Sequence, residues 1–251
     1  MTQSPTPDVI IYADGGGAKD SATGAGCIVE LGGNAKSRKY NVAQQIKIVA
    51  FMGQATNNEA EISAILMGLA VANAMDIIID TVAGKKEVVV KIVSDSEYAL
   101  KSATQYIFNW LRNGWKTASR EPVKNQGLWK VYLSLVAKLK IDIEHVKGHS
   151  GHKFNEACDD ACTWARFNGE EAIDEGASWL NDANDHEPPN GAIFPPPSYA
   201  GHVKIHKNPV GQDWILADLR YFLDLARQDN VAEAVNELNL LINNTLALIE
   251  S

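Results

Sequence analysis

The chain has 251 residues and 45% hydrophobic content, enough for one full domain with an appendage or for two small domains. Its three cysteines, few and irregularly spaced, exclude a disulfide framework and predict a reducing, cytoplasmic location. Residues 1–7 are polar, are expected to be disordered and show no signal peptide, and no apolar run approaches the ~18 residues of a membrane span.

The formal net charge of −8 is unevenly distributed along the chain. Residues 1–167 carry 19 Lys and Arg against 17 Asp and Glu, a balance of +2, whereas residues 168–251 carry 4 against 14, a balance of −10. This asymmetry indicates that the two parts have different tasks. The acidic part is not expected to bind nucleic acid.

Hydrophobic patterns predict an alternation of strands and helices within residues 8–167. Strands are expected at 9–13, 24–31, 39–52, 87–93 and 141–146. Helices are expected at 57–74, after Ser96, at 126–138 and at 154–166. A Gly32-Gly33 turn predicts that the second and third strands form an antiparallel hairpin. Three strands followed by alternating helices and strands predict an α/β fold, with a mixed five-stranded sheet and helices on its faces.

Residues 105–130 interleave aromatic and basic side chains. Against one acid, Glu121, this stretch carries a charge of +4. Such a pattern is typical of nucleic-acid surfaces, although tryptophans at this spacing are as often core residues. Both alternatives stay open for Trp110 and Trp115.

Four acids occupy positions where catalytic acids are found. Asp14 and Asp95 end two predicted strands, Glu61 lies one turn into the first helix, and Asp159 lies in the helix at 154–166. The carboxyl ends of neighbouring parallel strands meet at one edge of a sheet. Crowded carboxylates repel one another unless a cation neutralises them, and hard oxygen ligands suit Mg²⁺ or Mn²⁺. Each acid alone is more simply a turn former or a helix cap, so the case depends on the flanking residues.

Those flanking residues form five motifs across about 160 residues, and together they resemble the type 1 ribonucleases H of bacterial type. The motifs are IYADGG at 10–15, TNNEAE at 56–61, SDSEY at 94–98, NWLRNGWKTASREPVKN at 109–125 and VKGHSGHKFNEACD at 146–159. The resemblance implies a ribonuclease H-like fold and an endonuclease that cuts the RNA strand of an RNA/DNA hybrid. It also implies little sequence preference and products with 5′-phosphate and 3′-hydroxyl ends.

The resemblance also implies roles for individual residues. Asp14, Glu61, Asp95 and Asp159 would bind two Mg²⁺ ions, for which Mn²⁺ can substitute, and His149 would be the loop histidine that assists the attacking water or product departure. His152 is expected to orient the loop. The implied substrate-binding residues are Gly15, Gly16, Thr56, Asn57, Asn58, Trp110, Trp115, Lys116, Thr117, Lys124 and Asn155. Glu59 stands where many bacterial members have Arg or Lys near a DNA phosphate, which predicts repulsion of that phosphate.

Beyond Phe167 nothing resembles the family. Residues 168–212 predict a Pro/Gly-rich linker, and residues 213–251 predict an acidic helical extension with helices at 213–227 and 231–249. A stripe of apolar residues recurs along the second helix: Val231, Val235, Leu238, Ile242, Thr245 and Ile249. Three alternatives remain for the extension: extra helices packed on the nuclease, self-association through the stripe, or binding of a replication or repair protein.

Competing functions can be weighed by the same motifs. An exonuclease or transposase-type enzyme of this fold would show other acid spacings and would lack the basic protrusion of the bacterial members, which residues 109–125 resemble. A non-catalytic hybrid-binding module would be expected to lose some of the four acids. A reverse-transcriptase domain is disfavoured by the start at Met1 and by the protrusion. The last alternative is an interaction protein that acts through the acidic tail and carries the nuclease, and deletion of residues 168–251 would discriminate it.

Overall fold

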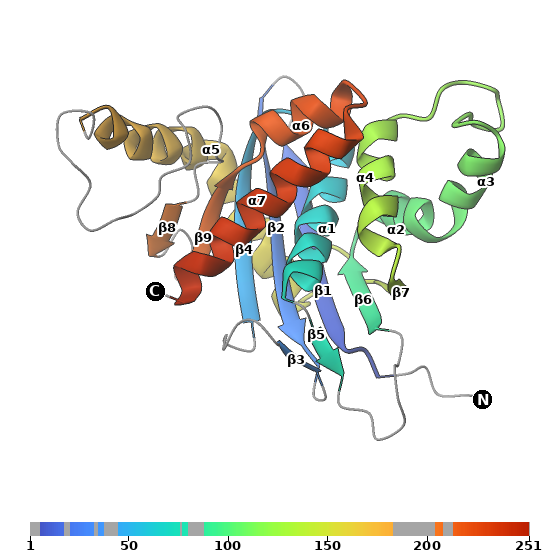
Figure 1. The fold of residues 1–251 in the computed structure, drawn as a ribbon, viewed down its shortest axis with the longest axis horizontal. Coiled ribbons are helices and arrows are strands. Elements are labelled where there is room, and N and C mark those ends of the chain that lie inside the picture. Colours follow the sequence, from blue (N-terminus) through green and yellow to red (C-terminus); the bar gives the residue numbers. More distant parts are fainter. Residues whose placement is uncertain are drawn as a thin grey trace.

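The main sheet of the protein has seven strands in the order β7-β6-β1-β2-β4-β9-β8 (Figure 1). The fold is a computed structural model that describes residues 6–17, 21–32, 35–37, 45–75, 77–79, 88–182, 204–207 and 213–250. The strands of this sheet are β1 (Val9–Gly17), β2 (Ala22–Leu31), β4 (Gln45–Gln54), β6 (Val88–Ser94), β7 (Leu139–His145), β8 (Lys204–Lys207) and β9 (Asp213–Asp218). Two short strands, β3 (Ala35–Ser37) and β5 (Ile77–Ile79), pair separately.

Five strands, β7-β6-β1-β2-β4, form the mixed sheet that the sequence predicts. β1 pairs antiparallel with β2 and parallel with β6, while β2 pairs antiparallel with β4 and β6 parallel with β7. The predicted third strand is confirmed from Gln45 onward, and its beginning at residues 39–44 lies outside the described residues. The α/β fold class is therefore confirmed.

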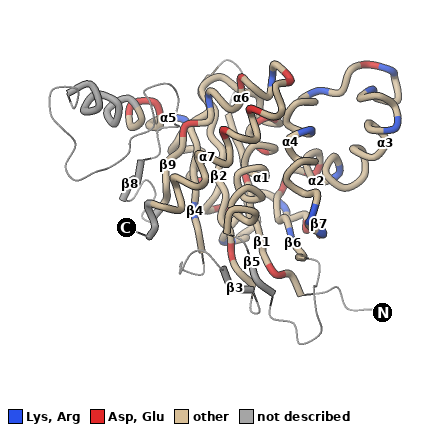
Figure 2. Tube along the Cα trace, in the orientation of Figure 1, with Lys and Arg blue, Asp and Glu red and all other residues tan. Residues whose placement is uncertain are grey.

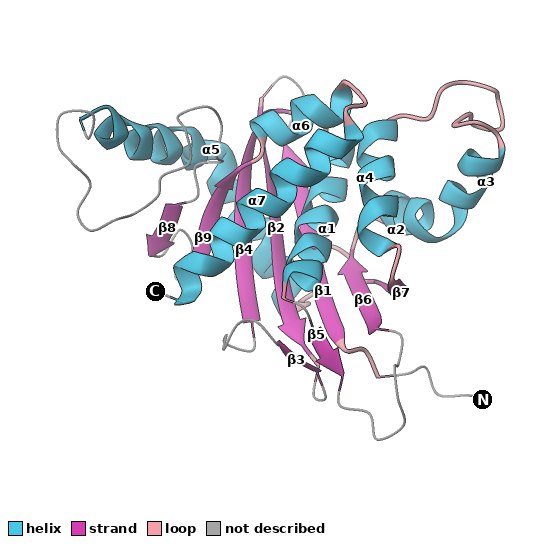
Figure 3. Ribbon diagram, in the orientation of Figure 1, coloured by secondary structure: helices cyan, strands magenta, loops and turns pink. Residues whose placement is uncertain are grey.

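Helices cover both faces of the sheet (Figure 3). They are α1 (Asn57–Ala74), α2 (Glu97–Lys101), the π-helix η1 (Ser102–Tyr106), α3 (Ile107–Arg112), α4 (Gln126–Val136), α5 (Lys153–Asp182), α6 (Arg220–Arg227) and α7 (Val231–Glu250). The core on one face involves α1, α4, α6 and α7, and the core on the other face involves α5. No helix in the described ranges is both long and apolar enough to cross a bilayer.

Helix α1 has the bounds that the sequence predicts, but it is buried on nearly all sides rather than along one stripe. Its residues from Ile62 to Ala72 are all buried. A helix that is apolar all round needs cover on every side, and here the sheet lies behind α1 while α4 and α7 pack against it. The C-terminal extension therefore completes the core around α1.

The structure corrects the expected organisation beyond Phe167. Helix α5 continues to Asp182 where a linker was expected, while 183–203 and 208–212 lie outside the described residues. Residues Asp213–Asp218 form β9, parallel to β4, rather than the start of a helix. A short apolar run has no periodicity that separates a buried strand from a helix, which explains the error.

The apolar stripe of α7 faces the rest of the same chain. Leu238, Ile242 and Thr245 are fully buried, and Val231 and Val235 pack partly buried against the same core. Among the three alternatives, this burial favours packing of the extension on the rest of the chain over self-association through these residues, because α1, α4 and α6 already cover them. Ile249 lies outside the described side chains.

Candidate active site

Three of the predicted acids meet at the carboxyl ends of β1 and β6. Asp14 lies in β1, Asp95 directly follows β6, and Glu61 lies in the second turn of α1. One carboxylate oxygen from each lies within 4.8 Å of the other two. A Cβ atom at Gly15 would overlap the backbone of α1 at Ala60 and Glu61, so glycine allows β1 and α1 to approach this closely.

Two of the three carboxyl groups, those of Asp14 and Glu61, have raised pKa values. Burial, followed by the charges of Asp95 and Asp159, raises the pKa of Asp14 to about 7. Burial, followed by the charges of Asp14 and Asp95, raises the pKa of Glu61 to about 9. Glu61 Oε2 is buried and has no hydrogen-bond partner among the described residues. Crowded carboxylate oxygens with an orphaned buried atom are a donor set that fits a hard divalent cation.

The fourth predicted acid, Asp159, lies beside this cluster rather than within it. Its charge raises the pKa values of both Asp14 and Glu61, yet the compact group found among the described residues contains only Asp14, Glu61 and Asp95. Asp159 Oδ2 lies 3.4 Å from Nδ1 of His149, whose side chain is 83% exposed. The predicted loop histidine and the fourth acid are thus neighbours at the open side of the cluster.

Two contacts to the acids were not predicted from the sequence. His145, the last residue of β7, places Nε2 3.1 Å from the backbone carbonyl oxygen of Asp95. Cys162 donates from Sγ to the carbonyl oxygen of Asp14 at 3.0 Å. Cys158 and Cys162 are buried free thiols, as expected for core residues. The parallel pairing of β6 with β7 brings His145 next to Asp95, and no local sequence signal predicts that contact.

Several predicted substrate residues surround the cluster. Gly16 is partly exposed, Asn58 is exposed, and Asn57 accepts a hydrogen bond from the Gly17 backbone at 3.0 Å. The hydroxyl of Thr56 is engaged in the N-terminal cap of α1, where it accepts from the Glu59 backbone. His152 accepts a 3.4 Å hydrogen bond from the Asn155 backbone through Nδ1, consistent with a role in the loop.

The basic protrusion, residues 109–125, begins in α3 and continues through the loop after it (Figure 2). Lys116 and Lys124 are exposed there. Thr117 is partly buried, and its hydroxyl lies 3.0 Å from that of Ser119, within the turn that closes the loop. The Lys130 ammonium lies 5.6 Å from the centroid of the partly buried Trp115 ring.

Burial disfavours substrate contact for two of the predicted residues. Trp110 is 8% exposed, and its ring centroid lies 5.9 Å from that of Trp129, which favours the core alternative. Asn155 is 2% exposed at the start of α5, so its side chain presents little surface to a ligand. Sequence spacing alone could not decide whether these two residues contact substrate or are buried, because aromatic and polar residues in helices do both.

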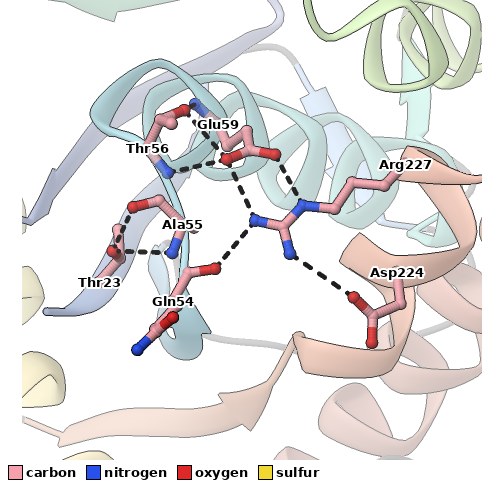
Figure 4. A network of polar contacts seen from close by, with 7 residues as sticks. All are labelled: Thr23, Gln54, Ala55, Thr56, Glu59, Asp224 and Arg227. Atoms are coloured by element: carbon pink, nitrogen blue, oxygen red, sulfur yellow. Dashed lines mark hydrogen bonds and ion pairs between the residues drawn. The ribbon is translucent and has the colours of Figure 1, made fainter. Parts of the chain in front are cut away.

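Glu59 does not present a free negative charge, which corrects the expectation that it repels phosphate. It is buried and accepts hydrogen bonds from Arg227 of α6 and from Thr56 (Figure 4). Burial opposes ionisation of Glu59, but the hydrogen bonds from Arg227 and Thr56 outweigh it and lower the pKa of the carboxyl. The partner is distant in sequence, so inspection of the motif could not reveal it.

Carboxylates clustered at the edge of a mixed α/β sheet can hold divalent cations of the kind that metal-dependent nucleases use. The RNase H family model matches residues 6–166, which is more than half of the chain. The chain belongs to the RNase H family. It is 34% identical over 153 residues to Ribonuclease HI of Neisseria meningitidis serogroup B, covering 61% of this chain and 90% of that protein.

Two further comparisons cover a smaller share of the matched protein. The chain is 39% identical over 108 residues to Ribonuclease H of Treponema pallidum, and the match spans 43% of this chain and 58% of that protein. A crystal structure of LC9-RNase H1, described as a type 1 RNase H with the type 2 active-site motif, aligns with a TM-score of 0.48 and 22% identity. That alignment covers 66% of this chain and 75% of the other.

Proposed function

We propose that the chain is an endonuclease that hydrolyses the RNA strand of RNA/DNA hybrids, with little sequence preference, and leaves 5′-phosphate and 3′-hydroxyl ends. One observation supports the proposal above all: carboxylate oxygens of Asp14, Glu61 and Asp95 lie within 4.8 Å of one another, and these residues belong to motifs of the RNase H family. Hydrolysis of a phosphodiester needs neutralisation of charge on the reacting phosphate, and a carboxylate cluster that binds cations supplies it.

The proposed cofactor is a pair of Mg²⁺ ions. Asp14, Glu61, Asp95 and Asp159 would hold them, with Mn²⁺ as a substitute. When bound, the ions would polarise the scissile phosphate and lower the pKa of the attacking water. His149, exposed beside Asp159, is able to exchange a proton with that water or with the leaving oxygen.

Choice of the hybrid requires contact with 2′-hydroxyl groups on one strand and a DNA-type backbone on the other. Gly15, Gly16, Asn57 and Asn58 lie next to the cluster and are the proposed contacts to the RNA strand. The exposed Lys116 and Lys124 of the protrusion are the proposed contacts to DNA phosphates. Base-reading contacts are not part of this proposal.

A four-substrate assay tests the proposal. The full chain and Mg²⁺ are incubated separately with four end-labelled substrates: RNA annealed to DNA, single-stranded RNA, double-stranded RNA and double-stranded DNA. The proposal predicts cutting of the hybrid alone, and sensitivity of the products to enzymes that require 5′-phosphate and 3′-hydroxyl ends. Equal cutting of single-stranded RNA, or products with 3′-phosphate ends, would contradict it.

A further inference from the structure

We propose that Arg227, in the C-terminal extension, is a positioning residue that holds the first turn of α1 and thereby sets Glu61 within the carboxylate cluster; this inference rests on the proposed function. Arg227 is the last residue of α6 and lies against the start of α1 (Figure 4). Its Nε donates to Glu59 Oε1 at 2.8 Å, and its Nη2 donates to Glu59 Oε2 at 3.2 Å.

The same guanidinium joins three elements. Nη2 also donates to the backbone carbonyl oxygen of Gln54, the last residue of β4, at 2.9 Å, and Nη1 lies 3.5 Å from Asp224 Oδ1 in α6. The planar guanidinium of arginine has several N–H donors and can bind these acceptors at the same time. A lysine ammonium is a compact charge on a flexible side chain and cannot reproduce this arrangement. Arg227 therefore ties the end of β4 and the start of α1 to the extension.

Glu59 requires this partner because it is almost inaccessible to bulk water. Its side chain is 10% exposed, and Oε2 also accepts from the Thr56 backbone at 2.8 Å and from the Thr56 hydroxyl at 3.0 Å. Glu59 is thus the N3 residue of the capping box at the start of α1, and Thr56 is its N-cap residue. Removal of Arg227 would leave a buried carboxylate without its counter-charge, which is strongly unfavourable.

Movement of the start of α1 would relieve that unpaired charge. A cavity of about 350 Å³ adjoins Glu59 and Arg227, between the starts of α1 and α4 and the end of α6. Without Arg227, the carboxylate would turn toward water in this cavity and loosen the capping box. Glu61 lies only two residues further along the same helix.

The position of Glu61 is sensitive to such a movement. Gly15 contacts the backbone of Ala60 and Glu61 directly, and Asn57 is hydrogen-bonded to Gly17, so β1 and the first turn of α1 fit together tightly. Asp14 directly precedes Gly15, and one of its carboxylate oxygens lies within 4.8 Å of a carboxylate oxygen of Glu61. A shift of the first turn therefore changes the distance between two carboxylates that must hold the same ions.

The test is calorimetric titration of the full chain with MgCl₂, together with hybrid-cleavage kinetics. Arg227→Gln is expected to raise the Kd for Mg²⁺ roughly 10-fold, the lower end of the loss seen when a supporting partner of a metal ligand is removed. The kcat should fall while KM for the hybrid changes little, because Arg227 does not contact substrate in this account. Arg227→Lys should lie between the wild type and Arg227→Gln.

Two further variants separate positioning from mere stability. Glu59→Gln/Arg227→Gln should recover most of the Mg²⁺ affinity, because a neutral glutamine keeps the capping box and needs no counter-charge. Arg220→Gln is the matched control: it removes an arginine of the same helix that pairs with Asp218, and it should leave the Kd for Mg²⁺ unchanged.

Unchanged Mg²⁺ affinity in Arg227→Gln would overturn the proposal. Equal losses in the single and double variants, both folded by near-ultraviolet circular dichroism, would also overturn it. If Arg227→Gln does not fold, the comparison of Arg227→Lys with the wild type decides, and equal affinities contradict the proposal. A wild type that binds Mg²⁺ but cuts no hybrid would refute the proposed function, whereas the Mg²⁺ titrations would still decide the role of Arg227.

Discussion

Asp14 and Glu61 approach to within 4.8 Å of each other through their carboxylate oxygens, and both carboxyl groups resist ionisation. Burial, followed by the charges of Asp95 and Asp159, raises the pKa of Asp14 from 3.8 to about 7. A carboxyl with a higher pKa in the folded chain than in the unfolded chain binds more protons when folded. The stability of the metal-free protein should therefore fall as the pH rises from about 4 to about 7.

Asp14→Asn should remove much of this loss. In metal-free buffer at pH 8 the variant is expected to melt above the wild type, by about 2–4 °C for each ~1 kcal/mol of repulsion relieved. At pH 4 the two should melt at more similar temperatures. Thermal melts from pH 4 to pH 8 measure the effect, with the exposed Asp160→Asn as the control. A lower melting temperature for Asp14→Asn at pH 8 would contradict the electrostatic account.

Two leucines of α7, one buried and one exposed, test whether the extension belongs to the core. Leu238 is fully buried against the core shared with α1, whereas Leu240 is 41% exposed. Leu238→Ala should lower the free energy of unfolding by about 2–5 kcal/mol, because it removes buried methyl groups and leaves a cavity. Leu240→Ala should change it by about 0.5 kcal/mol or less. Urea denaturation measures both, and similar small effects would mean that α7 does not belong to the core.

Removal of the extension should abolish folding of the nuclease. A chain ending at Asp182 lacks β9, α6 and α7, so it exposes the outer side of α1 and the edge of β4. A Cβ at Gly127 would overlap the carbonyl oxygen of Ala226, which shows how closely α4 and α6 are fitted. The truncated chain is expected to aggregate or to melt without cooperativity. A cooperative transition near that of the full chain would refute this prediction.

Lys124 is expected to contribute one phosphate contact to hybrid binding. In Lys124→Ala, the slope of log affinity against log salt concentration should decrease by about 0.9, the value for release of one counterion. Hybrid binding at 50 to 300 mM salt, measured by fluorescence anisotropy in Ca²⁺ to prevent cleavage, gives this slope. Lys138→Ala, beyond the end of α4, is the control and should keep the wild-type slope. An unchanged slope in Lys124→Ala would remove it from the interface.

Local signals in the sequence were sufficient for the central sheet and for the acids. Helix α1 spans Asn57–Ala74, as predicted. Strands β1 and β6 pair in parallel as far as Tyr12 and Val93, so Asp14 and Asp95, two residues further along each chain segment, come close together. Strand periodicity, capping residues and strand-end acids are all encoded within a few neighbouring residues. The positions of Asp14, Glu61 and Asp95 therefore followed from short motifs.

Contacts between distant segments could not be predicted in this way. The pairing of Glu59 with Arg227 and the pairing of β4 with β9 connect residues on the two sides of the expected linker. One signal was present but was not used: α1 is apolar on all its faces from Ile62 to Ala72. A helix of that composition requires a covering layer, and two amphipathic helices were expected beyond residue 212.

The most direct test of the central claim is Mg²⁺-dependent cleavage of one RNA/DNA hybrid by the wild type and by Asp14→Asn, with the folding of both confirmed beforehand. We expect the wild type to cut the RNA strand, EDTA to stop the reaction, and Asp14→Asn to bind the hybrid without cutting it. Undiminished cutting by Asp14→Asn, or none by the folded wild type with Mg²⁺ or Mn²⁺, would contradict the account.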